Sequence, residues 1–529
     1  MNRTKESLDR RIMFGALAVV VLAFAVSVAY RYRFLIEDDL VGIHQFLLMH
    51  STIIAENWHR SGFFNAHGLL YWYAKSIEYP GPLFQQVYTS FPAGGFILPY
   101  FVSWLFKLEV TPWLFQVYAL LNQFFIGLTV FAIARQLTTP IAARPIVRAV
   151  FCVMPACSIF FAPGYLWHFG STWFAEQAGV LPFVVAVFGD VLAIQSPQDS
   201  ANHRRARLLA FAAVLFGTYC DPAFFLEVSI FRFIVKLGLQ YNKKTRGFWR
   251  LGLECFVPFV LAVTVHLVQV FSLFGFERLV ELVRHASDHI NPTDRPITFG
   301  MLLLEYARQH FYLAYGRFRY LLPLIVLLTL ASIIGRRSTK ERRLTAIMLL
   351  GPPLLHILVW RRHTLAHNFN TVRLDPFVAL ASFCVVPLFI GEVLKKQTRL
   401  TLIAVMTSLF FIANAWQWKT IYRNVFISVV TQHKKPDVVE RAKLIGKKFG
   451  YQDVLMSPDF RIHALHEMAL IVYSKRTVHD VSSVSEMAAL AKRYPTARPV
   501  VLSTQHTRVM GCKDVIKLSN ELYYCYPKL

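Results

Sequence analysis

The feature that most constrains this chain is the repeated occurrence of apolar runs long enough to cross a lipid bilayer. The hydrocarbon core of a membrane is about 30 Å thick, and an α-helix crosses it with about 20 apolar residues. Met13–Tyr30 and Leu400–Trp416 are runs close to this length, and neither contains an acidic or basic residue. A helix of a soluble protein would show a polar face with a period of 3.6 residues, whereas these runs are apolar all round. The sequence therefore predicts a polytopic α-helical membrane protein.

The charge pattern argues against a nucleic-acid partner. Of the 529 residues, 55% are hydrophobic and 16% are charged, whereas ordinary soluble domains are about 25% charged. The net charge is +25, but Lys and Arg occur in short clusters between the apolar runs rather than in one stripe that could track phosphates. Such clusters mark the cytoplasmic side of membrane spans. The lipid bilayer is thus the expected partner, and no nucleic-acid partner is predicted.

Placing each basic cluster on the cytoplasmic side predicts about eleven spans, with a cytoplasmic N-terminus and an outer C-terminus. The first helix is expected to stay uncleaved, because Tyr30-Arg31-Tyr32-Arg33 follows it in place of a small-residue cleavage site. Counting Phe96–Phe106 as a span would move the later clusters outside, so we reject it. The expected spans are about Met13–Tyr30, Pro112–Ala134, Ala149–Ala162, Gln177–Ile194, Leu208–Tyr219, Ala223–Leu239, Leu251–Phe274, Tyr320–Ile334, Leu344–Trp360, Pro376–Leu394 and Leu400–Trp416.

Two segments fall outside this pattern. Residues 31–111 lack a full span and are rich in aromatic residues and proline, which is typical of helices that lie at the membrane interface. After Trp418 the composition changes to alternating helix and strand patterns, which indicates a small α/β domain. The predicted domains are therefore 1–418, a transmembrane domain with interfacial helices in 31–111, and 419–529, an α/β domain on the outer side.

Within that last domain, particular elements can be expected. Cys512 and Cys525 could form a disulfide if the domain lies in an oxidising compartment; their shared position in one tail could equally be chance. The expected helices are Asp437–Gly450 and Ile462–Tyr473, and the expected strands are Asp453–Ser457, Thr477–Val481 and Pro499–Ser503.

Three consecutive carboxylates, Glu37, Asp38 and Asp39, follow the first span on the predicted outer face. Adjacent carboxylates at a membrane surface repel one another and are partly desolvated, which costs free energy unless a cation or a substrate donor compensates. Such a carboxylate is suited to act as a general base that takes a proton from a hydroxyl or amine. The triplet could also bind a divalent cation, or it could be a solvated acidic patch that marks the end of a span.

The predicted outer loop between the ninth and tenth spans gathers cations where the positive-inside rule does not expect them. Arginine binds phosphate through two parallel hydrogen bonds and stays charged at any working pH. Arg361, Arg362, His367 and Arg373 are therefore candidates to bind a lipid phosphate or pyrophosphate. Contact with lipid headgroups, or an inverted topology, would also account for them.

The first outer segment carries weaker candidates. His59 and Arg60 end a predicted interfacial helix, and Tyr88 begins a predicted turn. These residues could contact an acceptor, although aromatic and basic residues at an interface more often anchor the chain in the membrane. The predicted loop Glu277–Arg319 spreads its histidines and carboxylates too widely for a metal motif, so we expect a solvated loop there.

Taken together, this layout resembles the GT-C superfamily of membrane glycosyltransferases, such as the protein mannosyltransferases and aminoarabinose transferases, which use polyprenyl- or dolichyl-phosphate sugars. In that superfamily an acidic residue or pair follows the first helix, and Asp38-Asp39 is similar to it. Ala55–Phe64 resembles the first interfacial helix, and Tyr88–Phe106 resembles the proline-containing stretch that precedes the second helix. His367–Leu380 resembles a late outer loop that leads into a helix beginning P-x-x-A-L.

The resemblance implies an inverting glycosyltransferase that moves a sugar from a polyprenyl-phosphate donor to a glycan, lipid or protein acceptor of the cell envelope. Asp38 or Asp39, beside Glu37, would deprotonate or orient the acceptor, and the lipid phosphate would leave. No soluble nucleotide sugar and no cofactor would be required, and a divalent cation near the triplet stays open.

Two other functions stay open at this point. A transporter or flippase of an anionic lipid or solute would show internal repeats and charged residues at mid-membrane. No repeat is visible, and Asp190, Asp221, Glu227 and Glu254 are scattered near the predicted span ends. A non-catalytic scaffold for envelope assembly is the third reading.

We prefer a bacterial inner membrane to the endoplasmic reticulum, because Asn2-Arg3-Thr4, the one glycosylation sequon, lies in the predicted cytoplasmic start.

Cysteine accessibility tests the predicted topology. In intact cells we expect a membrane-impermeant maleimide to label Asp39→Cys, and to label Ser338→Cys only after permeabilisation. Labelling of position 338 from outside would invert the topology and move the cationic loop to the cytoplasm.

Overall fold

The structure of the chain is a computed structural model with two compact units. The first unit is Met1–Phe34 with Val117–Ser428, and the second is Leu35–Gln116 with Val429–Leu529. The structure describes residues 2–35, 45–71, 87–139, 144–240, 247–290, 298, 300–301, 304, 322–334, 339–360, 372–393, 397–427, 436–450, 452–457, 478–481, 483–493, 495, 498–503, 512, 514–519 and 522–527.

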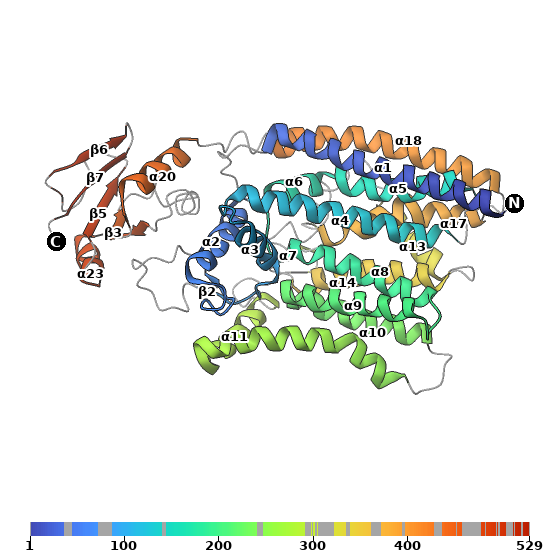
Figure 1. The fold of residues 1–529 in the computed structure, drawn as a ribbon, viewed down its shortest axis with the longest axis horizontal. Coiled ribbons are helices and arrows are strands. Elements are labelled where there is room, and N and C mark those ends of the chain that lie inside the picture. The colour runs from blue at the N-terminus through green and yellow to red at the C-terminus, as the bar shows by residue number, and fades with distance from the viewer. Residues whose placement is uncertain are drawn as a thin grey trace. The chain divides into compact units, whose positions relative to one another are not determined.

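The first unit is built of helices (Figure 1). In the described part of the chain, six helices are long and apolar enough to cross a membrane, and seven if the bent pair Pro145–Phe161 and Pro163–Gly170 forms one span. The chain is therefore a multi-pass integral membrane protein. Its helices are α1 (Asn2–Leu35), α4 (Pro112–Thr138), α5 (Pro145–Phe161), α6 (Pro163–Ser171), α7 (Ala175–Ala178), α8 (Val180–Gln195), α9 (Ala201–Cys220), α10 (Pro222–Gln240), α11 (Phe248–Ile290), α13 (Leu322–Ile334), α14 (Lys340–Val359), α16 (Asp375–Leu380), the π-helix η4 (Ala381–Val385), α17 (Val386–Val393), α18 (Gln397–Ile421) and the π-helix η5 (Tyr422–Ile427).

Helices also lie at the remaining predicted spans, but they are shorter or carry more charge. Helix α13 has 13 residues, α10 contains Glu227, Arg232 and Lys236, and α9 begins with a basic cluster. The segment Asp375–Gly391 is a further short apolar helix. The count of about eleven spans therefore stays a prediction, as does the domain boundary between 418 and 419.

Two predicted loops are wrong in part. Glu277–Arg319 begins as a helix, because α11 continues beyond a break at Gly275, whose φ of 72° is a conformation that glycine adopts at low cost. There the charges lie on the helix, with Arg278 and Glu281 forming an i,i+3 ion pair. The predicted outer loop Gly164–Glu176 contains the helix α6 and the start of α7. In both places a short helical stretch was too polar or too brief to predict as a helix.

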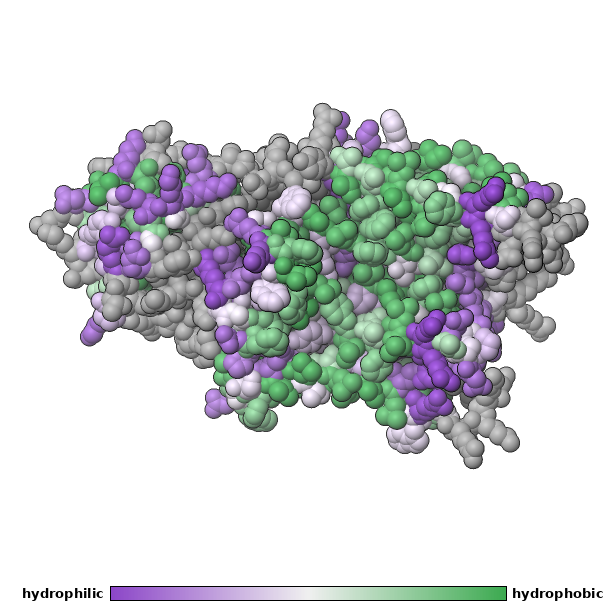
Figure 2. Space-filling model, in the orientation of Figure 1, coloured by the Kyte–Doolittle hydropathy of each residue, from purple (hydrophilic) through white to green (hydrophobic). Residues whose placement is uncertain are grey.

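Large apolar side chains face outward along the helices of the first unit, where Figure 2 shows a broad apolar surface. In water such a continuous surface would promote aggregation, whereas in a bilayer it faces lipid. Exposed examples are Phe14 and Leu22 on α1, Leu253 and Val268 on α11, and Leu402, Leu409 and Ile412 on α18.

Helices α8 and α9 pack with their backbones in close approach. A Cβ atom added at Gly189 would lie 2.9 Å from the Ala206 carbonyl oxygen and 2.9 Å from the Ala210 backbone nitrogen. Small residues at such a crossing let membrane helices associate through van der Waals contact. Glycine is therefore needed at position 189 for the observed packing.

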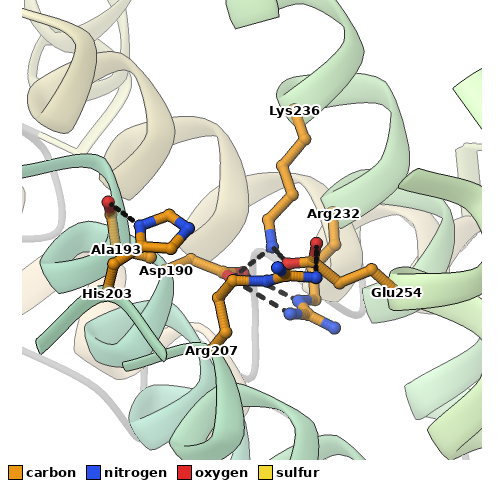
Figure 3. A network of polar contacts seen from close by, with 7 residues as sticks. All are labelled: Asp190, Ala193, His203, Arg207, Arg232, Lys236 and Glu254. Atoms are coloured by element: carbon orange, nitrogen blue, oxygen red, sulfur yellow. Dashed lines mark hydrogen bonds and ion pairs between the residues drawn. The ribbon is translucent and has the colours of Figure 1, made fainter. Parts of the chain in front are cut away.

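A network of charges that is buried at its centre ties four helices together (Figure 3). Asp190 of α8 accepts hydrogen bonds from Arg232 Nε at 2.7 Å and Nη2 at 3.0 Å, and Lys236 Nζ lies 2.7 Å from the same carboxylate. Lys236 also contacts Glu254 of α11 at 2.7 Å, and Arg207 of α9 contacts Glu254 at 2.7 Å. A buried charge is costly unless it is paired and hydrogen-bonded, so these contacts fix how α8, α9, α10 and α11 lie against one another.

The segment between α1 and α4 forms α2 (Gln45–Ser61), a two-stranded antiparallel sheet of β1 (Leu70–Tyr71) and β2 (Val87–Tyr88), and α3 (Gly94–Phe106). Helix α3 has 13 residues, so it is about 20 Å long and too short to cross about 30 Å of hydrocarbon. It buries Phe96 and Tyr100 and exposes Trp104. Such a two-sided helix suits the predicted interfacial position.

The C-terminal part is a five-stranded mixed sheet in the order β4-β3-β5-β7-β6. Side chains alternate along β3: Leu455 packs toward α20, whereas Val454 and Met456 pack toward α23. Both faces of the sheet are therefore covered, as in α/β proteins. The elements are α20 (Pro436–Lys448), β3 (Asp453–Ser457), β4 (Val478–Asp480), α23 (Val484–Arg493), β5 (Arg498–Ser503), β6 (Ile516–Ser519) and β7 (Leu522–Cys525).

This confirms the predicted small α/β segment. One expected helix and three expected strands are present as α20, β3, β4 and β5, while the expected helix Ile462–Tyr473 lies outside the described residues. Helix α23 and strands β6 and β7 were not predicted. Cys512 and Cys525 form a disulfide, with their Cα atoms 6.0 Å apart.

Gly189→Ala tests the close approach of α8 and α9. We expect the added methyl group to force the helix backbones apart and to destabilise the protein by about 1–3 kcal/mol, the usual effect of overpacking. Gly238→Ala in α10 is the matched control, because no atom lies within 4 Å of its added Cβ; it should be neutral or stabilise by about 0.5–1 kcal/mol. Thermal unfolding in mild detergent measures both variants, and wild-type stability of Gly189→Ala would contradict the packing.

Candidate functional site

The structure describes four of the ten predicted site residues: Arg373, His59, Arg60 and Tyr88. The others are Glu37, Asp38 and Asp39 of the acidic triplet and Arg361, Arg362 and His367 of the cationic loop, and they lie outside the described residues. Their roles therefore stay predictions.

His59 and Arg60, in the last turn of α2, both have partners within their own segment. His59 Nε2 lies 2.6 Å from the Ser103 hydroxyl of α3, and Arg60 Nη2 donates to Glu56 at 2.8 Å. Burial lowers the pKa of His59, and the nearby Glu56 acts in the opposite direction. These contacts join α2 to α3 and hold the end of α2 in place.

Tyr88 lies in β2, where it is partly buried. Its ring centroid is 5.8 Å from that of Phe91, which follows the strand. Tyr88 thus contributes to packing in this segment, and its predicted contact with an acceptor stays a prediction.

Arg373, just before α16, is the predicted site residue with the most informative surroundings. Its side chain is 1% exposed, and its Nη2 donates to Asp221 Oδ2 in a buried ion pair. Its guanidinium carbon lies 4.6 Å from the ring centroid of Phe224, a cation–π contact. Among the described residues, its Nε and Nη1 have no hydrogen-bond partner. The guanidinium is thus held by the hydrogen bond from its Nη2 to Asp221 and by the Phe224 ring against one of its faces.

Asp221 and Phe224 belong to the turn that joins α9 to α10. Asp221 precedes Pro222, the first residue of α10, and its Oδ1 accepts a hydrogen bond from the Phe224 backbone N–H at 3.2 Å. This is the geometry of a helix N-cap, in which aspartate is favoured and proline suits the next position. Asp221 therefore uses one carboxylate oxygen to cap α10 and the other to bind Arg373.

A second buried pair lies one turn further along α10. His356 Nδ1, in the last turn of α14, lies 3.1 Å from Glu227 Oε2. The His356 ring meets the Phe224 ring edge-on at 5.8 Å and stacks with Trp360 at 6.1 Å. Arg373 and Asp221 both lie close enough to Glu227 to act electrostatically on it. The two pairs therefore form one polar cluster.

The cluster collects residues from separate helices at one end of the first unit (Figure 1). Helix α9 ends and α10 begins at Asp221, α14 ends next to His356, and α16 begins after Arg373. The Tyr165 hydroxyl of α6 donates to the Val372 carbonyl at 3.1 Å and so fixes the approach to α16. In the predicted topology this end is the outer one.

Sequence reasoning missed Asp221, Phe224, Glu227 and His356 as members of a site. Asp221 and Glu227 were noted only as scattered charges near span ends. The available signal was the Asp221-Pro222 dipeptide, which marks the start of a helix. Nothing in the sequence indicates that its carboxylate meets an arginine 152 residues away.

Within the described part of the chain, no group of three His, Cys, Asp or Glu side chains is placed to hold a metal ion. The predicted divalent cation concerns the acidic triplet, which that part does not include. Metal dependence is therefore left to experiment.

The sequence matches no protein-family model and no curated protein. The structure, in contrast, is similar to solved membrane enzymes. Apo ArnT from Cupriavidus metallidurans matches with a TM-score of 0.59 and 12% identity over 97% of this chain and 98% of that one. The same enzyme bound to undecaprenyl phosphate matches with a TM-score of 0.57 and 12% identity, over 96% and 97% of the two chains.

An archaeal oligosaccharyltransferase is also similar. AglB from Archaeoglobus fulgidus, in complex with an inhibitory peptide and a dolichol-phosphate, matches with a TM-score of 0.52 and 12% identity. The match covers 92% of this chain and 69% of AglB. At this identity the likeness is one of fold, and it confirms the predicted resemblance at that level: the chain has a GT-C-like fold, shared with ArnT and AglB.

Proposed function

We propose that this protein is a glycosyltransferase that moves a sugar from a polyprenyl-phosphate donor to an envelope glycan, lipid or protein acceptor at the outer face of the membrane. The observation that carries the proposal is the likeness of fold to ArnT, which extends over nearly the whole of both chains. Solved relatives of this fold bind undecaprenyl phosphate in one case and a dolichol-phosphate in another. A lipid-phosphate donor is thus the ligand class that the proposal assigns to this chain.

In the proposed reaction, the acidic triplet supplies the base. Asp38 or Asp39, with Glu37 beside them, takes the proton from an acceptor hydroxyl or amine as that group attacks the anomeric carbon. The bond between the anomeric carbon and the phosphate oxygen breaks, and the bonding electrons leave with the polyprenyl phosphate. Attack opposite the leaving group inverts the anomeric configuration. A cation bound to the triplet would orient the acceptor, and omission of divalent metal from the assay tests whether one is needed.

The leaving phosphate gains negative charge, so cations must be placed near it. We assign this role to Arg361, Arg362, His367 and Arg373. The burial of Arg373 in a low-dielectric environment supports its part in this assignment, because an aimed hydrogen-bond donor is stronger where water is excluded. His59, Arg60 and Tyr88 are proposed to line the approach of the acceptor, although their present contacts also serve packing.

A transfer assay tests the proposal. The purified protein in nanodiscs receives a radiolabelled polyprenyl-phosphate sugar and a cell-envelope extract as acceptor. We expect Asp38→Asn or Asp39→Asn to lower the transfer rate by about 10²-fold or more, the usual contribution of a general base, while Asp199→Asn, an exposed carboxylate between α8 and α9, leaves it unchanged.

The results also separate the competing functions. Transfer at the wild-type rate by both variants and by the double mutant would remove the triplet from the mechanism. Binding of the lipid-linked sugar with no transfer by the wild-type protein would favour a transporter or flippase. Neither binding nor transfer would favour a scaffold.

The disulfide tests the proposed outer position of the C-terminal part. We expect Cys512 and Cys525 to be linked in cells whose free thiols are blocked at once on lysis, since such bonds persist in oxidising compartments. Non-reducing peptide mass spectrometry detects the linked pair. The cysteines are 13 residues apart, so Cys512→Ser should destabilise this part by about 3 kcal/mol. Two free thiols in freshly blocked cells would contradict the outer position.

A further inference from the structure

Two buried arginines of the first unit differ in how completely the protein satisfies them. Arg232 and Arg373 are each 1% exposed. Arg232 donates through Nε and Nη2 to both oxygens of Asp190, a two-point contact that leaves one of its nitrogens, Nη1, without a partner among the described residues. Arg373 donates through Nη2 alone to one oxygen of Asp221. Both pairs hold a charge in the interior, but only the first uses two nitrogens of the arginine.

The donors that Arg373 leaves over are buried. In the described part of the chain, its Nε and Nη1 make no hydrogen bond, although neither is in contact with solvent. A buried N–H group without an acceptor costs free energy, and such groups are rare in folded proteins. An acceptor that comes with a ligand would satisfy them.

The geometry of Asp221 leaves it little freedom to follow Arg373. Its Oδ1 caps α10 through the Phe224 N–H, so the carboxylate is fixed to the first turn of that helix. The ring of Phe224 in the same turn covers one face of the guanidinium. The first turn of α10 thus holds Arg373 through its Nη2 atom and one face of its guanidinium. These two contacts fix the direction in which the remaining N–H groups point.

The chemistry of these donors selects an anionic oxygen. Arginine stays charged and matches the geometry of phosphate oxygens. Within the cluster Asp221 already balances the charge of Arg373. The pair therefore contributes oriented N–H donors rather than a net positive charge. The additional charge for a phosphate would come from Arg361 and Arg362 under the proposed function.

We infer that Asp221 is a positioning residue for the donor site: it fixes Arg373 so that an unused N–H group of the guanidinium, Nε–H or Nη1–H, donates to a phosphate oxygen of the lipid donor. The inference rests on the proposed function and adds to it a residue outside the cationic loop. Without the charge of Asp221, the ion pair that holds the Arg373 guanidinium is weakened, so its remaining donors lose their fixed direction.

Direct binding of undecaprenyl phosphate to the full-length protein in detergent tests this inference without relying on transfer. Asp221→Asn is the informative variant, because asparagine caps a helix as well as aspartate does and removes only the charge. We expect its dissociation constant to rise about tenfold, which corresponds to about 1.4 kcal/mol. Arg373→Lys, which keeps the charge and loses the fork, should weaken binding at least as much.

Asp190→Asn is the matched control, because it breaks the other buried arginine–aspartate pair. We expect it to lower the unfolding temperature while leaving the affinity of the folded protein unchanged. If it weakened binding as much as Asp221→Asn does, the effect would be one of general packing, and the inference would fail.

The remaining outcomes are distinct. Tighter binding by Asp221→Asn would show that the carboxylate competes with phosphate, and unchanged binding would show that it does not position Arg373; either result overturns the inference. In both cases weakened binding by Arg373→Lys would leave the proposed donor class intact. Failure of the wild-type protein to bind undecaprenyl phosphate would instead remove the donor class itself, and the inference with it.

Discussion

The structure of the first unit depends on the cost of burying charge among membrane helices. Lipid gives helices no hydrophobic reason to associate, and an ionised side chain inside the bilayer is expensive unless it finds a partner. Helix α10 concentrates this requirement, because it carries Glu227, Arg232 and Lys236 and is capped by Asp221. Their partners lie on α8, α11 and α14 and just before α16. Ion pairs, which have direction, thus fix the neighbours of α10 in a way that apolar contacts do not.

The two ends of α10 use this principle differently. At its C-terminal end, Arg232 and Lys236 share Asp190, and this network links four helices into a rigid frame. At its N-terminal end, Arg373 meets Asp221 through a single nitrogen, so a cation is held in place with donors to spare. A binding site needs groups that are held in position by their surroundings. The two sets of ion pairs fix both ends of α10 among its neighbours, and in this way they hold Arg373 in position.

The sequence predicts the parts of the fold that the bilayer dictates. Apolar length alone identifies helices such as α1 and α18, because a membrane sets the number of residues needed to cross it. A short apolar run identifies β3 in the same way. Hydropathy, however, treats each charge separately. It does not reveal the pairing of Asp221 and Glu227, because their partners, Arg373 and His356, lie more than a hundred residues away in the sequence. For the site, the sequence therefore predicts Arg373 as a candidate phosphate-binding residue. Only the fold reveals that Asp221 and Phe224 hold its side chain.

Helix α5 packs against two helices that are far apart in sequence, α1 and α16. Phe160, near the end of α5, contacts Phe24 of α1 with ring centroids 5.3 Å apart, and α16 packs against the same helix. The chain leaves α1 toward the acidic triplet Glu37–Asp39 and enters α16 from the cationic loop Arg361–Arg373. A base and a leaving-group stabiliser must lie on opposite sides of one anomeric carbon, within the length of a sugar phosphate. Under the proposed function, the shared neighbour α5 supports such an arrangement of the two segments, although Glu37–Asp39 and residues 361–371 themselves lie outside those that the structure describes.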